Sequence, residues 1–257
     1  MKRNIFVLAA ATALCCGCSL LSNITVDQNT LASAASTAMT AISITDEQIA
    51  QLSAQSVAQL DASSKVDNGA YARRIQKLFG NLKSVDNIPL NFKVYQNSEI
   101  NAFACGDGSI RVYSGLMDAM DDDELTAIIG HEIGHVVHKD TKAAMKQAYL
   151  TYAAAEALGS VSGTIGELSK GAIGSIAQSY LSAQFSQKQE YAADNYGFQF
   201  AINRGYGAYS MYKALNKLLT LSNSSGSASL VQKMFSSHPG TEERAERMKQ
   251  AAVSYKK

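Results

Sequence analysis

Five residues near the middle of the chain constrain its fold most strongly, the run His131-Glu132-Ile133-Gly134-His135. Apolar residues recur around it at helical spacing from Leu125 to Val137, which predicts that the run lies on an amphipathic helix. Residues four apart share one face of a helix, so the two imidazoles should point to the same place. Asp121, followed three residues later by Glu124, matches a capping box at the start of this helix.

A histidine pair with this spacing indicates a metal site. Two imidazoles one turn apart can bind a single Zn²⁺. Glu132 is rotated from His131 by about 100°, so it can act as a general base on metal-bound water instead of binding the metal. The competing interpretation is chance, because a chain of this length matches the pattern at random with a probability of about one per cent. The amphipathic context favours the metal, and we expect one Zn²⁺ per chain.

A catalytic zinc takes three protein ligands and keeps a fourth position for water, so another ligand is needed. Glu190 is the best candidate, because Glu190 and Asp194 are one turn apart on a predicted helix. Glu190 would bind the metal, and Asp194 would accept the second N–H of a ligating histidine. Alternatively, both acids belong to a solvated helix face. The incomplete histidine site upstream favours the ligand interpretation.

The spacing of these residues resembles the gluzincin metallopeptidases, the family that includes the HtpX proteases and the CAAX prenyl endopeptidases. The likeness rests on the His131–His135 run and on Glu190-Tyr191-Ala192-Ala193-Asp194, about 55 residues later. It extends from about residue 70 to the C-terminus and is greatest to lipid-anchored periplasmic members. The resemblance implies a mostly helical α+β zincin-type fold, with a small sheet beside the active-site helix, and the activity of a zinc metalloendopeptidase.

Two further stretches match the same family. Asn101-Ala102-Phe103-Ala104 resembles its active-site edge strand, which implies pairing with an extended substrate backbone. His238, in Ser237-His238-Pro239, resembles a C-terminal element and is the candidate donor to a developing oxyanion; a surface histidine before a helix is the alternative. Arg244 is expected to hold this loop through a salt bridge. One departure is Asp140, which stands where many relatives carry a histidine.

The first 17 residues have the pattern of a cleaved targeting segment. Two basic residues precede a short apolar stretch from Ile5 to Leu14, which is too short to span a bilayer. Gly17-Cys18 then resembles a bacterial lipoprotein cleavage site, so Cys18 is expected to carry lipid, and Ser19 favours the outer membrane. An ordinary secretory signal peptide is the alternative. Residues 18–45 would form a lipidated tether, and residues 46–257 the metallopeptidase domain.

Charge and cysteine content narrow the function further. Without residues 1–17 the chain has 21 basic and 22 acidic residues, which gives no indication of nucleic-acid binding. If Cys18 carries lipid, only Cys105 remains, so the mature chain cannot form an internal disulfide. Cys105 follows the predicted edge strand, and the glycine-rich turn after it offers little apolar cover. We therefore expect its thiol to be partly exposed, although a small hydrophobe in the core is the alternative.

The remaining pattern predicts helices before and after a small sheet, and hence an α+β fold. Helical spacing predicts helices over 46–60, 71–82, 206–221 and 242–253. Strands are predicted around 92–95 and 110–113, with a hairpin turn at 106–109 and a Ser/Gly loop at 222–229. Residues 141–183 are rich in Ala, Gly and Ser, but charges interrupt them and argue against a transmembrane span. A helical hairpin is expected there, with a mobile lid over the metal cleft as the alternative.

These features together predict a zinc-dependent endopeptidase of the bacterial cell envelope that cleaves unfolded or flexible protein segments in envelope quality control. Its expected partners are protein or peptide substrates and, through Cys18, the periplasmic face of the outer membrane. The competing class is a lipoprotein chaperone or assembly factor whose protease site is gated or little used. Replacing Glu132 with glutamine discriminates between the two, because it stops turnover but leaves a binding function intact.

Overall fold

Helices make up most of the chain and two small sheets complete it, so the predicted, mostly helical α+β class is confirmed. The computed structural model describes residues 43–157, 170–224 and 226–256, together with a few isolated positions before residue 43. The expected signal peptide, Cys18 and most of the tether lie outside this part. Among the described residues, no helix is both long and apolar enough to cross a membrane.

The larger sheet has three strands in the order β3-β5-β4. β3 (Asn91–Tyr95) runs parallel to β5 (Ser109–Tyr113), and β4 (Ala102–Ala104) pairs antiparallel with β5 at the edge of the sheet. The predicted strands and the hairpin turn between β4 and β5 are therefore confirmed. In this register Ala104 lies opposite Ile110.

A second sheet is a ribbon of two short strands, β1 (Ser84–Val85) and β2 (Ile88–Pro89). This ribbon was not predicted, because two residues are too few to show an alternating pattern. Its turn places Asp86 and Asn87 in the left-handed region, with φ of 46° and 63°. Asp and Asn tolerate this region better than most residues other than glycine, so the local sequence suits the turn.

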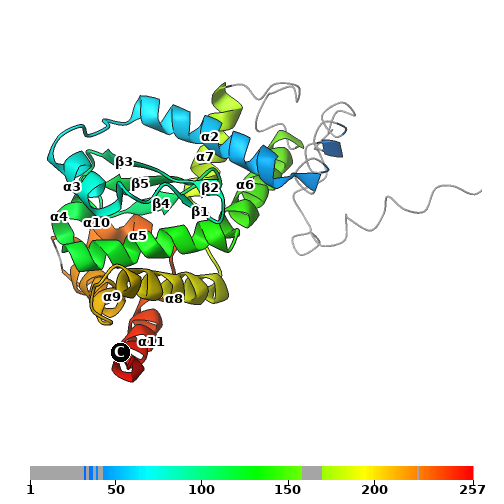
Figure 1. Ribbon diagram of the computed structural model, residues 1–257. Coiled ribbons are helices and arrows are strands. Elements are labelled where there is room, and N and C mark those ends of the chain that lie inside the picture. The colour runs from blue at the N-terminus through cyan, green and yellow to red at the C-terminus, as the bar shows by residue number, and fades with distance from the viewer. Residues whose placement is uncertain are drawn as a thin grey trace, which may run out of the picture.

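The helices lie in layers on both sides of the larger sheet (Figure 1). α2 crosses one side, α5 crosses the other, and α8, α9 and α11 lie beyond α5 (Figure 1). The helices in chain order are α2 (Asp46–Ser63), α3 (Ala70–Phe79), α4 (Ser114–Ala119), α5 (Asp122–Val137), α6 (Asp140–Ala157), α7 (Lys170–Leu181), α8 (Gln187–Asn203), α9 (Ser210–Ser222), α10 (Ala228–Ser237) and α11 (Thr241–Ser254).

Most predicted helices are found with their ends shifted by a few residues. α10 was not predicted, because the serine- and glycine-rich stretch before it indicated a loop and the helix has only ten residues. α6 and α7 pack against each other in the segment predicted to form a helical hairpin. The connection between them, residues 158–169, lies outside the described residues.

The hydrophobic core consists of two clusters. The larger cluster joins the sheet to α5, α8, α9 and α11, and includes Ile110, Ile129 and Leu215. The smaller cluster joins the sheet to α2, α6 and α7, and includes Met145 and Ile176. The sheet is thus covered on both sides, which explains why every residue of β4 and β5 is buried.

The expectation that Cys105 is exposed is wrong. Its side chain is 1% exposed and belongs to the smaller cluster. Burial raises the pKa of the thiol well above its ordinary value, which makes the thiolate scarce at neutral pH. The apolar cover comes from distant segments: a Cβ atom on the adjacent Gly106 would lie 2.6 Å from Ile49 Cγ2 of α2. A turn sequence could not reveal this cover, because it depends on tertiary packing.

An ion-pair network fastens α2 to the sheet. Arg111 on β5 is 1% exposed, and its Nε lies 2.8 Å from Asp61 Oδ1 of α2. Lys93 Nζ lies 2.7 Å from the other oxygen of Asp61, and the Tyr95 hydroxyl donates to Asp61 at 2.6 Å. Against the effect of burial, these hydrogen bonds lower the pKa of Asp61 to about 2.

The lowered pKa of Asp61 gives a prediction for acid stability. An unfolded aspartate titrates near pH 3.9, so this group stabilises the fold above that pH and loses its contribution as pH falls toward 2. The shift corresponds to about 2 kcal/mol. We expect Asp61→Asn to be less stable at neutral pH and to lose less stability than wild type between pH 4 and pH 2. Urea unfolding of metal-stripped protein at each pH measures this, and equal slopes would contradict it.

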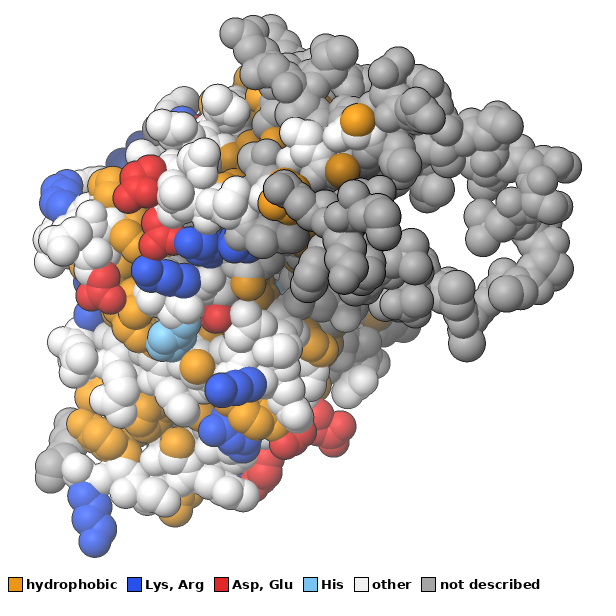
Figure 2. Space-filling view, turned by 90° about the vertical axis from the view of Figure 1, so that its right-hand side faces the viewer, with side chains coloured by type: hydrophobic (Ala, Val, Ile, Leu, Met, Phe, Trp, Pro, Cys, Tyr) orange, Lys and Arg blue, Asp and Glu red, His pale blue; other side chains and the backbone are white. Residues whose placement is uncertain are grey.

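Charged side chains of both signs are mixed on the face shown in Figure 2. Apolar side chains lie between them over the same face (Figure 2). The whole chain has a net charge of +1. A mixed surface of this kind creates no strong field of one sign.

Candidate metal centre and active site

α5 carries the histidine pair, and its start follows the predicted capping box. The Asp121 backbone N–H donates to Glu124 Oε2 at 2.9 Å, and the Asp121 side chain accepts from the backbone at Glu124. The helix is buried from Glu124 to Val136 because the sheet and α8 cover opposite sides of it. His131 and His135 project from one face, with their Nε2 atoms 3.0 Å apart.

α8 approaches α5 closely because glycines lie at the contact. A Cβ atom on Gly197 of α8 would lie 2.5 Å from the Ala127 carbonyl oxygen of α5, a distance that side chains do not adopt. A Cβ atom on Gly134 would lie 3.1 Å from Ala193 Cα. This close packing brings the first turn of α8 beside the histidine pair, and Glu190 is part of that turn.

Glu190 lies between the two histidines of α5. Its Oε1 is 3.4 Å from His135 Nε2, and its Oε2 is 3.7 Å from His131 Nε2. The side chain is fully buried. The structure therefore brings together the three residues that the sequence predicts as metal ligands.

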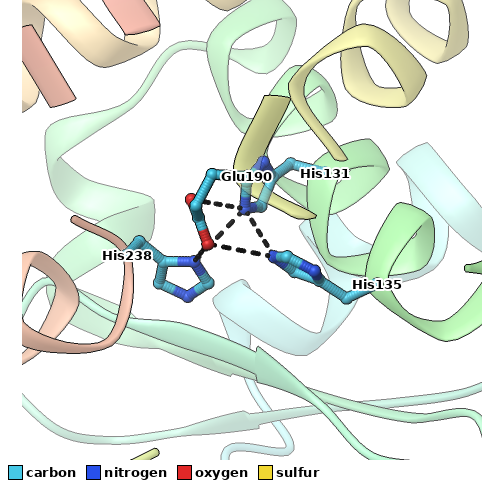
Figure 3. A group of neighbouring side chains, drawn as sticks. All are labelled: His131, His135, Glu190 and His238. Carbon is cyan, nitrogen blue, oxygen red and sulfur yellow. Dashed lines mark hydrogen bonds and ion pairs between the residues drawn. The ribbon is translucent and has the colours of Figure 1, made fainter. Parts of the chain in front are cut away.

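His238, from the loop after α10, joins this group. Its Nδ1 lies 3.0 Å from Glu190 Oε1 and 3.3 Å from His131 Nε2 (Figure 3). One atom from each of His131, His135, Glu190 and His238 lies within 4.8 Å of the others, close enough to hold one ion. The alternative of a surface histidine is wrong, because His238 is 5% exposed. Its place among the possible ligands was not anticipated, since the sequence predicted only a donor to the oxyanion.

Each histidine of α5 has its own carboxylate partner. His131 Nδ1 lies 2.9 Å from Asp194 Oδ1, as expected, and His135 Nδ1 lies 2.9 Å from Asp140 Oδ2. The role of Asp140 was not predicted, because in the sequence it stands out only as a departure from the family pattern. The sequence feature that could have predicted this contact is an acidic residue five positions after the second histidine, at the start of the next helix.

Arg244 from α11 holds the acids of α8. Its Nε lies 2.8 Å from Asp194 Oδ2 and its Nη2 lies 2.6 Å from Asp194 Oδ1, a two-pronged contact. Its Nη1 forms an ion pair with Glu190 and lies 3.4 Å from the His238 carbonyl oxygen. The expected salt bridge that ties this loop down is therefore present.

Negative charge dominates the surroundings of the cluster. Against the effect of burial, the charge of His238 and hydrogen bonds from His135 and His238 lower the pKa of Glu190. Arg244 likewise lowers the pKa of the buried Asp194 to about 2. Both acids are therefore ionised, and carboxylates at positions 132, 140, 190 and 194 surround the site with Arg244 as the fixed cation.

The two histidines of α5 respond differently to these surroundings. Burial lowers the pKa of His131, which keeps that imidazole neutral. Burial also acts on His135, but hydrogen bonds to Asp140 and Glu190 outweigh it and raise the pKa to about 9. The pocket thus favours positive charge at its centre. Imidazole and carboxylate donors with an excess of negative charge fit a divalent cation such as Zn²⁺.

The predicted substrate strand, β4, lies at an edge of the sheet. The Asn101 carbonyl oxygen accepts from the Tyr113 backbone N–H at 3.0 Å, and the Cys105 backbone N–H donates to the Ser109 carbonyl oxygen at 2.8 Å. These main-chain groups therefore face β5. The alternation along a strand then directs the main-chain groups of Ala102 and Ala104 away from β5. Among the described residues, Asn101 Oδ1 is a buried acceptor with no hydrogen-bond partner.

The chain itself covers both the metal cluster and this edge. The Phe185 ring stacks on the His135 imidazole, with centroids 3.9 Å apart, and its backbone N–H donates to Ser237 at 3.2 Å. The Tyr180 hydroxyl donates to the outward-facing carbonyl of Ala104. Beside Glu132, the cavity that reaches the cluster has a volume of only about 10 Å³. The described structure is therefore a closed form of the site.

The fold and the site define a class. A buried His-Glu-x-x-His helix, a glutamate from a second helix and an adjoining edge strand are the components of a zincin-type metalloprotease. The chain belongs to peptidase family M48, whose profile matches residues 67–252. Two relatives from Escherichia coli K12 align over nearly their whole length. The chain is 34% identical to metalloprotease LoiP over 250 residues, which cover 96% of this chain and 95% of LoiP.

Identity to metalloprotease YcaL is 33% over 261 residues, which cover all of both proteins. A protease HtpX homolog from Salinibacter ruber is 27% identical over 210 residues, 71% of this chain and 76% of that protein. The alignments with LoiP and YcaL cover the histidine helix, α8 and the C-terminal helices together. The chain is therefore a metalloprotease.

Proposed function

We propose that the protein is a zinc-dependent endopeptidase that cleaves unfolded or flexible protein segments. The observation that carries this proposal is the buried cluster of His131, His135 and Glu190 with Glu132 beside it. The three would hold one Zn²⁺, and Asp194 would fix the orientation of His131. Bound zinc supplies a polarised water whose pKa lies near neutrality.

Glu132 is the residue that would move the proton. Its carboxylate would accept a proton from the attacking water and then deliver it to the nitrogen of the leaving amine. Its Oε1 is buried and accepts no hydrogen bond from the described residues, which leaves it available for this role. His238 Nε2 lies 3.6 Å from the same oxygen, so His238 would be close enough to donate to the oxyanion when it does not bind the metal.

An extended segment is the substrate that the edge strand favours. The outward main-chain groups of Ala102 and Ala104 would pair with the backbone of the substrate, while Asn101 Oδ1 would accept one of its N–H groups. Main-chain pairing makes few demands on side-chain identity. It does require an extended backbone, so folded proteins would be poor substrates.

We also propose that the enzyme acts in the bacterial cell envelope. The basis is the N-terminal sequence alone: a basic start, a short apolar stretch and Gly17-Cys18. Lipid on Cys18 would anchor residues 18–45 as a tether at the outer membrane, with the metallopeptidase domain, residues 46–257, facing the periplasm. Cleavage of unfolded segments in that compartment would serve envelope protein quality control.

The closed form of the site favours a second candidate, an assembly factor or chaperone with a gated protease site. Phe185 covers His135, and the Tyr180 hydroxyl donates to the Ala104 carbonyl with which a substrate backbone would pair. A substrate could reach the cluster only after both contacts break. In this candidate the closed form predominates, and binding of client proteins does not require turnover.

Removing the metal tests the proposed activity. Treatment with 1,10-phenanthroline is expected to stop cleavage of reduced, carboxymethylated α-lactalbumin, and one equivalent of Zn²⁺ should restore it after the chelator has been removed by dialysis. Native α-lactalbumin, with its disulfides intact, is the matched control and should be cleaved much more slowly. Fragment formation followed by mass spectrometry measures both. Cleavage that survives chelation, or equal cleavage of the native control, would contradict the proposal.

A further inference from the structure

We propose that Asp140 and Gln189 form a positioning pair that orients His135 and couples it to the helix that carries Glu190. The inference rests on the proposed zinc site and extends it. It assigns a role to the acid at the start of α6 and to a glutamine in the first turn of α8. Neither residue would touch the substrate, so both would act through His135.

Asp140 accepts a hydrogen bond from Nδ1 of His135, the ring nitrogen on the side away from Glu190. The Nδ1–H of His135 donates to Asp140 Oδ2 at 2.9 Å, and the Asp140 side chain is 8% exposed. A carboxylate in this position keeps a proton on Nδ1, so that Nε2, which lies 3.4 Å from Glu190 Oε1, is the nitrogen that would bind the ion. It also strengthens the imidazole as a ligand, since it makes the ring more basic.

The backbone turn between α5 and α6 places Asp140 at this point. α5 ends at Val137, and Lys139 adopts the left-handed region with φ of 60°. This conformation is uncommon for a residue other than glycine. It reverses the chain within a few residues, so that the first residue of α6 comes back to the histidine on the last turns of α5. The uncommon conformation of Lys139 is explained if the site requires Asp140 to lie beside His135.

Gln189 holds the other oxygen of Asp140. Its Nε2 donates to Asp140 Oδ1 at 2.9 Å, while its Oε1 accepts from the Ser186 backbone N–H at 2.8 Å. Gln189 thus completes the capping box of α8 and contacts Asp140 with the same side chain. Glu190 is the next residue after Gln189. The Gln189 side chain therefore links the turn of α8 that carries Glu190 to Asp140, the hydrogen-bond partner of His135.

The pair therefore connects the two elements that supply metal ligands. Asp194 and Arg244 support His131 from one side of the cluster, and Asp140 and Gln189 support His135 from the other. The two supports share no residue. Loss of the second support should therefore weaken metal binding even when Asp194 and Arg244 are intact.

The test is zinc affinity, measured by competition with a chelator on the full-length protein. Asp140→Ala is expected to weaken Zn²⁺ binding by about 10- to 100-fold, the usual effect of losing an outer partner of a ligand. Asp140→Asn retains an acceptor for the Nδ1 proton without the charge, so its affinity should lie between those of wild type and Asp140→Ala. Asp123→Ala, which removes an acid of α5 that pairs with Lys213, is the matched control and should bind zinc like wild type.

Gln189→Glu separates positioning from stability. A glutamate at this position of the helix still serves the capping box, so thermal unfolding of the metal-free protein should change little. It replaces the donor to Asp140 with a second carboxylate, so zinc affinity should fall. Nitrogen-15 NMR of the metal-loaded protein should show the His135 Nδ1 proton in wild type and Asp140→Asn, and its faster exchange with water in Asp140→Ala.

The outcomes are distinct. Wild-type protein that binds no zinc would overturn the proposed function itself. Wild-type protein that binds zinc, with Asp140→Ala and Gln189→Glu both within twofold of it, would overturn the positioning pair alone. If Asp140→Ala does not fold, Gln189→Glu decides: unchanged affinity rejects the pair and weakened affinity with unchanged thermal stability supports it.

Discussion

Replacing Glu132 with glutamine is expected to lower the rate of peptide cleavage by about 10²- to 10⁴-fold, the usual contribution of a general base. Glutamine has the same shape but cannot accept the proton of the attacking water. The carboxylate is 2% exposed and lies beside the cluster without holding His131 or His135 through a hydrogen bond. Zinc content should therefore stay at one ion per chain. Initial rates on an unfolded substrate and elemental analysis of the same sample measure both quantities.

The same variant decides between the two candidate functions. An assembly factor with a little-used protease site would keep its activity in cells when Glu132 is replaced, whereas a quality-control protease would lose it. Envelope proteins that accumulate in cells with the variant, identified by mass spectrometry, would be the substrates. Asp123→Asn is the control for a changed acid on the same helix. Cleavage by Glu132→Gln at more than a tenth of the wild-type rate would remove Glu132 from the role of base.

Replacing Glu190 with alanine is expected to abolish stoichiometric zinc binding. Glu190 is the only candidate ligand from α8, and its oxygens lie 3.4 Å from His135 and 3.7 Å from His131. A zinc site with an open position has three protein ligands. The loss of one ligand should therefore lower zinc affinity by more than the factor of about 10 to 100 that a hydrogen-bond partner of a ligand contributes. Zinc per chain after dialysis against a zinc buffer measures the effect.

Two controls make the Glu190 result specific. Glu190→Gln preserves the volume of the side chain, so a loss of zinc in both variants points to the carboxylate and not to a cavity. Asp194→Ala should bind zinc more weakly but still retain it. Circular dichroism of the metal-free proteins shows whether each variant is folded. Full zinc occupancy in a folded Glu190→Ala protein would show that Glu190 is not a required ligand. His238 would then be the residue that completes the site.

The parts of the site that could be predicted from sequence depend on local spacing. His131 and His135 share a helix face, Asp121 and Glu124 form a capping box, and Glu190 precedes Asp194 by one turn. Each pattern follows from the geometry of a single helix. The family resemblance added the edge strand and marked His238 for attention. These features were available before any tertiary contact was known.

The remaining parts depend on contacts between distant segments. His238 reaches His131 across 107 positions of the chain, and no local pattern places it among the possible ligands. The cover over Cys105 comes from α2, α6 and α7, so a glycine-rich turn misleadingly indicated exposure. Asp140 is near His135 in sequence, but its role depends on the left-handed turn at Lys139, which is rare for lysine and has no sequence signature.

The ion pair between Asp61 and Arg111 sets the smallest fragment of this protein that can fold as described. The family profile begins at residue 67, after the end of α2 at Ser63. A recombinant fragment cut at that boundary would keep the buried Arg111 of β5 and discard its counter-ion, Asp61 of α2. Breaking a buried pair in this way costs about 3–5 kcal/mol, a large part of the about 5–15 kcal/mol that stabilises a typical domain. Recombinant fragments and domain fusions should therefore begin before Asp46, since the region that the family profile matches is shorter than the unit that folds.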